Sequence, residues 1–199
     1  GVAGLCADPD GSGGGAMKPV AIYLIGAPGS GKTTLMNEIV GELGGYGEEF
    51  RVCRETFANR INGRDGWVLG KHRAKNGGTD ACGKAASGWF RRYIEGGGEL
   101  PGLILGEGER LGFANFLEML AEHTDLYVVY LDAGYSREAR LEARDGSDCA
   151  MLGSGGKALA TRAANVRDKL LEKGVEVDTV KTGDGVDYVE LAQMLLGWL

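Results

Sequence analysis

The sequence predicts an α/β fold in which a parallel sheet is flanked by helices on both faces, and three observations support this. Continuous apolar runs, typical of strands buried on both faces, occur at Val20–Ile25 and Leu126–Leu131. Segments with helical spacing alternate with such runs, a pattern that gives parallel sheets covered on both sides. The chain has 199 residues, 43% of them hydrophobic, which suits one domain of this class.

The first half of the chain is expected to contain these elements in order. The first strand, Val20–Ile25, is followed by a helix over Thr34–Leu43, where Leu35, Ile39 and Leu43 recur at helical spacing. Residues 57–80 are poorly patterned. The remaining expected elements are short strands at Phe50–Cys53 and Trp67–Leu69, a helix over Ala81–Glu95 that ends at three glycines, and a buried strand at Leu103–Leu105.

The second half repeats the alternation of helices and strands. The strand at Leu126–Leu131 is rich in β-branched and aromatic residues. Gly174 suits the position after a helix end. The other expected elements are helices over Phe113–His123, Ser136–Arg144 and Lys157–Lys173, a strand at Val175–Val180, and a closing helix over Asp187–Leu199.

Composition and charge narrow the class of protein further. The net charge of −6 disfavours a protein that coats nucleic acid non-specifically, although it allows a local basic groove. The apolar runs are too short to span a membrane, and no charged segment precedes an apolar one as in a secretory signal. The four cysteines are far apart and form no CxxC pair, which favours reduced thiols and a cytoplasmic location (Cys6, Cys53, Cys82 and Cys149).

Residues 1–16 differ in composition from the rest of the chain. Six of the sixteen are glycine, residues 11–15 have the composition of a flexible linker, and Met17 follows at once. We expect a tag or linker here, with the natural start at Met17; a natural disordered extension is the alternative. The single domain is expected to span residues 17–199.

The segment between the first strand and the first helix carries a phosphate-binding motif. It reads Gly26-Ala27-Pro28-Gly29-Ser30-Gly31-Lys32-Thr33 and has the strand–loop–helix context that the motif G-x-x-x-x-G-K-[ST] requires. Glycines let backbone N–H groups turn toward phosphate oxygens, and the helix N-terminus attracts the same anion. We expect Lys32 to reach the β- and γ-phosphates in catalysis, Thr33 to ligate magnesium, and Thr34 to complete the binding segment. The sequence therefore predicts a P-loop NTPase domain that binds ATP and Mg²⁺.

Two acidic residues follow the strand at Leu103–Leu105. In P-loop proteins an acid at this place holds the magnesium ion, usually through water. Glu107 is nearest the strand end and is the first choice, with Glu109 as the alternative. Because loops after strands often carry acids, either residue alone also fits a purely structural role.

Asp80 lies just before the helix expected over Ala81–Glu95. In a structural role it would cap that helix. In a functional role it would be the general base that takes a proton from a hydroxyl acceptor of phosphate. The two roles are compatible, and a phosphate acceptor would need no such base.

A cationic stretch surrounds Asp80 in the sequence. Lys71, His72, Arg73 and Lys75 precede it, and Arg91 with Arg92 follows, so the stretch suits an acceptor phosphate or a nucleic-acid backbone. A solvated charged face is the alternative. Trp67 and Trp89 suit stacking on a base or packing in the core. Neither His72 nor His123 has a partner pattern typical of a triad or a metal site.

A second set of arginines brackets a glycine-rich segment at residues 146–156. Small P-loop kinases place lid arginines in such a region to clamp phosphates during transfer. Arg140 and Arg144 are four apart, so one helix face presents both, and we expect them to act in catalysis. Salt bridges to neighbouring glutamates are the alternative. A mobile lid is expected around residues 137–167, which also contain Arg137, Arg162 and Arg167.

Three motifs together resemble a known group of kinases. Tyr23–Leu35 resembles the small nucleotide-kinase branch of P-loop proteins, which implies a nucleoside-monophosphate-kinase-like fold. With Gly78-Thr79-Asp80-Ala81 and Leu105-Gly106-Glu107-Gly108-Glu109-Arg110-Leu111, the chain is similar to bacteriophage P-loop kinases that phosphorylate 5-hydroxymethyluracil in DNA during thymidine hypermodification. The resemblance spans about residues 18–180.

The resemblance implies an ATP-dependent kinase acting on a hydroxymethyl group of a DNA base, with Asp80 as its activator. The base would be presented outside the stack, in the host cytoplasm. A nucleoside or nucleoside monophosphate kinase is the second hypothesis, although the Asp-Gly-Tyr/Phe-Pro-Arg signature of adenylate kinases is absent. An ATPase switch is the third.

Overall fold

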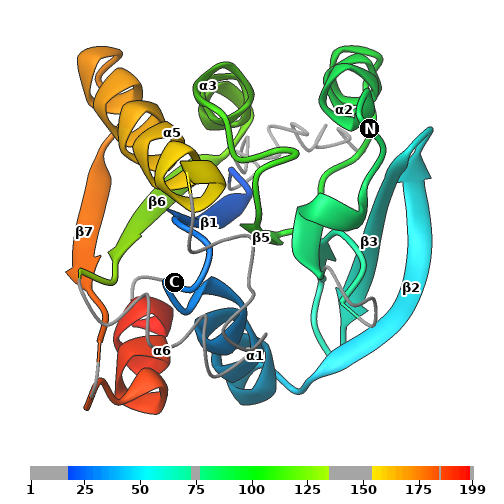
Figure 1. Ribbon diagram of the computed structural model, residues 1–199. Helices are drawn as coiled ribbons and strands as arrows, with labels where there is room; N and C mark the ends of the chain where they lie inside the picture. Colours follow the sequence, from blue (N-terminus) through cyan, green and yellow to red (C-terminus); the bar gives the residue numbers. More distant parts are fainter. Residues whose placement is uncertain (1–17, 73–76, 135–153, 184, 198–199) are drawn as a thin grey trace, which may run out of the picture.

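A seven-stranded sheet forms the centre of the protein in the computed structural model, which describes residues 18–72, 77–134, 154–183 and 185–197 (Figure 1). The strands lie in the order β2-β3-β4-β5-β1-β6-β7. They are β1 (Val20–Gly26), β2 (Tyr46–Cys53), β3 (Thr56–Ile61), β4 (Gly66–Leu69), β5 (Leu103–Glu107), β6 (Asp125–Asp132) and β7 (Val177–Lys181). The helices are α1 (Lys32–Glu42), the 3-10 helix η1 (Gly78–Ala81), α2 (Ala86–Glu95), α3 (Ala114–His123), α5 (Ser154–Glu172) and α6 (Tyr188–Leu196).

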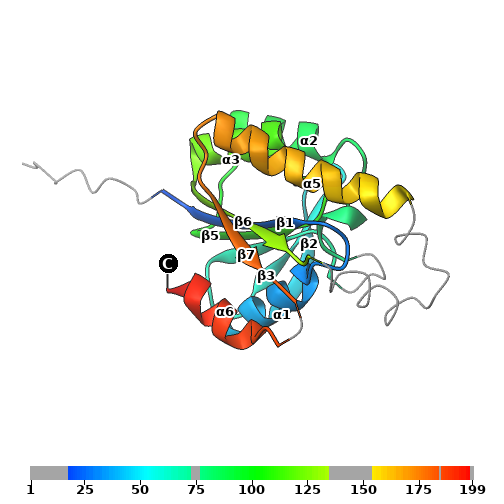
Figure 2. The same ribbon diagram turned by 60° about the vertical axis from the view of Figure 1, so that its left-hand side comes forward.

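Helices cover both faces of the sheet, as the sequence predicts. Helices α2, α3 and α5 lie on one face, and α1 and α6 lie on the other (Figures 1 and 2). Strand β1 supplies both cores because its side chains alternate: Ala21 and Tyr23 join one core, and Ile22 and Leu24 join the other. The predicted α/β class is confirmed. Within the described residues, no helix is both long and apolar enough to cross a membrane.

The central strands place their carboxyl ends at one edge of the sheet. Strand β1 pairs in parallel with β5 and β6, so Leu24 lies opposite Glu107 and Gly26 lies opposite Leu131. Each strand therefore ends near the loop that follows its neighbour. This arrangement brings together the glycine-rich loop Gly26–Thr33 and the acidic turn, residues 107–110 at the end of β5.

One strand runs against the others, which the sequence does not predict. Strand β3 pairs antiparallel with both β2 and β4, whereas the remaining neighbours are parallel. Its Asn59 and Arg60 interrupt an apolar pattern, yet both find tertiary partners. The Asn59 side-chain amide donates to the Gly70 carbonyl at 3.1 Å, and the Arg60 guanidinium lies 5.0 Å from the centre of the Phe50 ring.

Several predicted boundaries also shift. The helix expected over Ala81–Glu95 begins at Ala86 instead, because the chain first makes the turn of η1. The strand expected at Phe50–Cys53 starts earlier, at Tyr46. The helix expected over Ser136–Arg144 lies outside the described residues.

Candidate functional site

The loop after β1 has the backbone conformation that its glycines allow. Gly26, Gly29 and Gly31 have φ angles of 149°, 80° and 91°, which residues with a side chain rarely adopt. A Cβ atom on Gly26 would also lie 2.7 Å from the carbonyl oxygen of Leu131 on β6. The loop can therefore follow this path only with glycine at these positions.

Lys32 and the start of α1 create a positively charged point inside this loop. The Lys32 ammonium donates to the carbonyl oxygens of Gly26 at 2.7 Å and Ala27 at 3.0 Å. The N-cap residue of α1, Gly31, has no side chain to compete with an anion for the first N–H groups of the helix. Thr34 lies exposed in the first turn of α1. An ammonium beside a helix N-terminus is well suited to phosphate.

The loop is also held by two residues that are distant from it in sequence and that the sequence analysis did not identify. The Thr182 hydroxyl, just after β7, donates to the Ser30 carbonyl at 2.8 Å in a buried contact. The Tyr188 hydroxyl, at the start of α6, lies against Gly31 so closely that a Cβ there would collide with it. A polar residue directly after β7 is the one sequence signal that points to Thr182.

Thr33 and Glu107 form the pair best placed to hold a cation. The Thr33 hydroxyl donates to Glu107 Oε2 at 3.1 Å, and Glu107 is only 2% exposed. The other carboxylate oxygen, Glu107 Oε1, is buried and has no hydrogen-bond partner within the described part of the chain. Because such buried oxygens are rarely left without a partner, this one fits a missing ligand, and hydroxyl and carboxylate oxygens are donors that Mg²⁺ prefers.

The electrostatic environment of Glu107 also fits a cation. Burial raises the pKa of the Glu107 carboxyl, whereas the Lys32 charge and the Thr33 hydrogen bond lower it; the nearby Asp80 carboxylate raises it. A divalent ion beside Oε1 would favour the ionised form of Glu107. No three His, Cys, Asp or Glu side chains gather into a metal cage among the described residues, so phosphate oxygens and water would complete the shell.

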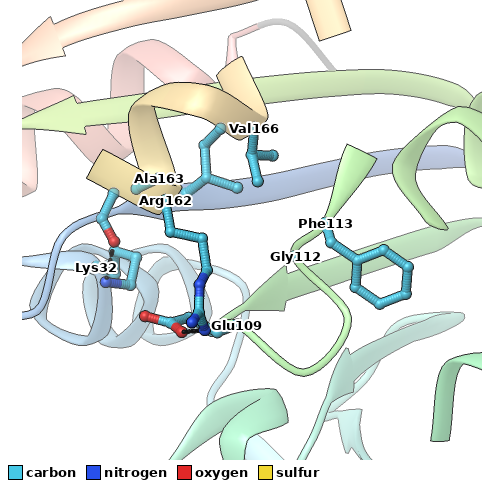
Figure 3. A pocket seen from close by; sticks show the side chains of 10 residues that line it. Lys32, Glu109, Gly112, Phe113, Arg162, Ala163 and Val166 are labelled. Atoms are coloured by element: carbon cyan, nitrogen blue, oxygen red, sulfur yellow. Dashed lines mark hydrogen bonds and ion pairs between the residues drawn. The ribbon is translucent and has the colours of Figure 1, made fainter. Parts of the chain in front are cut away.

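Glu109 has a different environment from Glu107. Its carboxylate forms an ion pair with the Arg162 guanidinium of α5 at 3.2 Å, and both side chains are partly exposed. Figure 3 shows Arg162 reaching from α5 toward Glu109. Of the two candidate metal ligands, Glu107 is therefore the one turned toward Thr33.

Asp80 lies beside this acidic turn and does not cap α2, whose N-cap is Ala85. Asp80 Oδ1 accepts hydrogen bonds from the backbone N–H groups of Glu109 at 2.6 Å and Arg110 at 3.3 Å. The residue is exposed at the end of η1. Its carboxylate thus has a fixed orientation while remaining accessible to an acceptor.

A small cavity of about 70 Å³ opens next to Lys32. Figure 3 shows Lys32, Glu109 and Arg162 on one side of it and Phe113 on the other. Ala163 of α5 adds to its apolar wall. The cavity offers charged groups at the phosphate end and apolar contact further away, which suits a compact organic acceptor.

The cationic stretch around Asp80 is largely engaged in structural contacts. Lys71 pairs with Glu49 at 3.5 Å and lies 3.8 Å from the centre of the Phe57 ring. His72 stacks on Tyr46 with 4.8 Å between ring centres. Burial lowers the pKa of His72, which favours the neutral imidazole.

The arginines and tryptophans of the same region are engaged as well. Arg54 and Arg92 both lie over the Trp89 ring, at 4.9 and 4.8 Å from its centre. Trp67 of β4 packs edge-on against Phe50 of β2. The Arg91 guanidinium donates to a carbonyl at the start of α3, that of Asn115, at 3.3 Å.

Several predicted site residues fall outside the described part of the chain. These are Arg73, Lys75, Arg137, Arg140 and Arg144. Of the lid-side arginines that the structure describes, Arg162 reaches the cavity, whereas Arg167 pairs with Asp168 and lies over the Tyr130 ring.

The chain was compared with protein families, curated proteins and solved structures. No protein-family model matches it, and no curated protein matches it. Among solved structures it is similar to shikimate kinase from Acinetobacter baumannii in complex with shikimate. The identity is 20% and the TM-score 0.46, covering 90% of this chain and 92% of that one.

Proposed function

We propose that the protein is an ATP-dependent phosphotransferase that uses Mg²⁺ and delivers the γ-phosphate to a hydroxyl acceptor. The observation that carries this proposal is the convergence of Lys32, the Thr33–Glu107 pair and Asp80 at one edge of the sheet. The buried, unpartnered Glu107 Oε1 supports a bound cation at this point.

Each residue has a distinct task in this reaction. The loop Gly26–Thr33 and the start of α1 bind the phosphates through N–H groups, and Lys32 neutralises charge on the transferred group. Thr33 and Glu107 hold Mg²⁺, which supplies further neutralisation of the phosphate oxygens when bound. Groups held in position before the substrate arrives are the main source of catalysis in phosphoryl transfer, and the hydrogen bonds of Lys32, Thr33 and Asp80 support such a role.

Asp80 is the group that makes a hydroxyl acceptor preferable to a phosphate acceptor. A hydroxyl must lose its proton as the new P–O bond forms, and a carboxylate within reach can accept it. The two backbone N–H groups that hold Asp80 Oδ1 orient the carboxylate without covering it.

The preferred acceptor is 5-hydroxymethyluracil in phage DNA, with modification taking place in the host cytoplasm. The support is that the three motifs of the resemblance, which are distant in sequence, meet in one site: the loop at Gly26–Thr33, Thr79–Asp80 of η1, and Glu107–Glu109 after β5. DNA would present the base outside its stack.

A free nucleoside, nucleoside monophosphate or similar small molecule is the second candidate acceptor. The specific observation in its favour is that Lys71, His72 and Trp89, which belong to the described part of this stretch, are held by internal contacts. The small volume of the cavity beside Lys32 also suits a compact acceptor.

The test follows labelled γ-phosphate from ATP to several acceptors in parallel. They are DNA containing 5-hydroxymethyluracil, ordinary DNA, and a panel of free nucleosides, monophosphates and small hydroxyl compounds. We expect label on one class of hydroxyl compound, and a loss of at least about 100-fold in turnover for Asp80→Asn with ATP binding retained.

Asp65→Asn is the matched control. Asp65 Oδ2 also accepts from a backbone N–H group, that of Gly102 at 2.8 Å, but at the opposite edge of the sheet. Near-normal turnover of Asp80→Asn would contradict the base assignment. Label released only to water, with every acceptor inert, would indicate an ATPase switch and overturn the transferase proposal.

A further inference from the structure

Tyr23 is an unexpected residue for the central strand of the sheet. Its side chain is 1% exposed, and its hydroxyl lies in the interior beside the functional edge. Burial raises the pKa of this hydroxyl well above its ordinary value, so Tyr23 stays a hydrogen-bond donor. None of the roles proposed above uses it.

The Tyr23 ring is surrounded by the glycines of the acidic turn. Gly106 lies opposite Tyr23 in the β1–β5 register, and a Cβ on Gly106 would collide with the ring. On the other side, a Cβ on Gly112 would lie 3.1 Å from the ring edge and would collide with the Gly108 carbonyl oxygen. The end of β5 and the turn after it therefore pack closely around the Tyr23 ring and around each other, and both positions carry glycine.

The hydroxyl of Tyr23 joins two separate parts of the candidate site. It donates to the Gly108 carbonyl at 3.0 Å and lies 3.0 Å from the Thr79 hydroxyl. Thr79 in turn donates to the Glu107 carbonyl at 2.8 Å. Two hydroxyl groups inside the protein thus connect η1 with the carbonyls of the consecutive residues Glu107 and Gly108, where β5 ends.

The exposed Asp80 also links η1 to the acidic turn. Thr79 and Asp80 are neighbours in η1, so the buried hydroxyls fix the place from which the Asp80 carboxylate reaches the N–H groups of Glu109 and Arg110. On the opposite face of the turn, Glu107 points toward Thr33. The proposed base and the proposed metal ligand thus both adjoin groups that the Tyr23 and Thr79 hydroxyls contact.

We propose that Tyr23, acting through Thr79, is a positioning residue that fixes the Asp80 carboxylate relative to Glu107. The inference rests on the proposed function for its catalytic consequence, although the positioning itself can be measured independently. Tyr23 is buried, and its hydroxyl contacts only Thr79 and Gly108 among the hydrogen bonds above, so its effect passes through η1 and the acidic turn.

Tyr23→Phe is the direct test because it keeps the ring between Gly106 and Gly112 and removes only the hydroxyl. The first readout is amide hydrogen exchange at Glu109 and Arg110, whose N–H groups Asp80 holds. We expect exchange at both amides to accelerate at least about 10-fold, since the opening of a hydrogen bond controls it. The second readout is acceptor phosphorylation, where kcat should fall at least about 10-fold while KM for ATP stays within about twofold.

Thr124→Val is the matched control for general destabilisation. The Thr124 hydroxyl is equally buried and donates to the Leu120 carbonyl at 2.8 Å, but it lies at the opposite edge of the sheet. This variant should leave both readouts unchanged. A pair of variants at Thr79 controls for misfolding. Thr79→Val should reproduce the effects of Tyr23→Phe, whereas Thr79→Ser, which keeps the hydroxyl, should give wild-type values of both readouts.

Two outcomes would overturn the proposal. Unchanged exchange at Glu109 and Arg110 in Tyr23→Phe would mean that the hydroxyl does not position Asp80, and faster exchange with unchanged kcat would mean that the position does not matter for transfer. If the wild-type protein phosphorylates no acceptor, the proposed function fails by that result alone. The exchange measurement still decides whether Tyr23 holds Asp80.

Discussion

The nucleotide side of the site (Gly26–Thr33 with Glu107) and the basic cluster (Lys71, His72, Arg91 and Arg92) differ in how their polar groups are satisfied. On the nucleotide side, Glu107 Oε1 is buried and lacks a hydrogen-bond partner within the residues that the structure describes. In the basic cluster, each side chain has a protein partner: Glu49, an aromatic ring, or a backbone carbonyl. The nucleotide side thus has a buried acceptor that a ligand could use, whereas the four side chains of the basic cluster already contact protein groups.

This difference in hydrogen-bond and ion-pair partners indicates a binding site on the nucleotide side and a charged surface at the basic cluster. A buried polar atom without a partner costs about 1–3 kcal/mol, so it persists where a ligand later supplies the contact. Cations that already pair with aromatic rings or carboxylates are satisfied without any ligand. Sequence alone presents both regions as candidate phosphate sites; the contacts distinguish them.

The largest expected effect is the loss of Lys32. Lys32→Ala removes the ammonium at the phosphate end, and transfer should fall by about 100- to 1000-fold because a preorganised charge is lost. Lys18→Ala is the control, since the Lys18 ammonium also donates to a backbone carbonyl, that of Ala121 at 3.0 Å, but at the far edge of the sheet. Steady-state transfer assays measure both. More than a tenth of wild-type turnover in Lys32→Ala would remove the main support for the site.

The second effect separates the two glutamates. Glu107→Gln should raise the Mg²⁺ concentration needed for half-maximal turnover by at least about 10-fold, because one of the groups holding the metal loses its charge. Glu109→Gln should change this concentration by less than about twofold, since Glu109 pairs with Arg162. A Mg²⁺ titration of turnover measures the difference. If Glu109→Gln raised the required Mg²⁺ concentration and Glu107→Gln did not, Glu109 would be the residue that holds the metal ion.

A pH-dependent effect on stability follows from the raised pKa of Glu107. With this pKa above its usual value near 4.5, the folded protein binds the proton more tightly than the unfolded chain. The resulting stabilisation is complete below about pH 4.5 and is lost as the pH rises through the raised pKa. Without Mg²⁺ or nucleotide, the free energy of unfolding of Glu107→Gln should therefore be higher than that of the wild type near pH 7.

Denaturant unfolding across a pH series measures this effect. The gap between Glu107→Gln and wild type should narrow as the pH falls toward 4.5, where the wild-type carboxyl is protonated as well. Saturating Mg²⁺ and ATP should remove the advantage of the variant, because a cation favours the ionised carboxylate. A gap that stays constant with pH would show that burial does not perturb Glu107.

The smallest expected effect is in the basic cluster. Lys71→Ala should lower the free energy of unfolding by about 1 kcal/mol or less, since it removes a partly exposed ion pair and a contact with Phe57. Turnover and the KM for any acceptor should change by less than about twofold. A large rise in KM for DNA, with KM for free nucleosides unchanged, would show that the basic cluster takes part in binding DNA.

Most of the fold could be predicted because its elements have long, regular patterns. The runs at Val20–Ile25 and Leu126–Leu131 identify the central strands, and helical spacing identifies α1, α3 and α6. Strand β3 could not be predicted, because Asn59 and Arg60 break its alternation and are satisfied only by residues distant in sequence.

The candidate site also has a part that the sequence predicts and a part that it does not. The loop Gly26–Thr33 is a local motif, so its geometry follows from a short stretch of sequence. The choice between Glu107 and Glu109, and the contact between Tyr23 and Thr79, depend on strand register and on side chains 56 or more positions apart. The position of Glu107 nearest the strand end favours it over Glu109, whereas spacing along the chain contains no signal for the contact between Tyr23 and Thr79.

The most direct test of the account is a crystal structure with Mg²⁺ and a non-hydrolysable ATP analogue. We expect phosphates in the loop Gly26–Thr33, with the terminal one beside Lys32, and the metal ion between Thr33 and Glu107, bound directly or through water. Asp80 should face the terminal phosphate across the space for an acceptor. A metal ion held by Glu109 instead, or an analogue bound away from the loop, would contradict it.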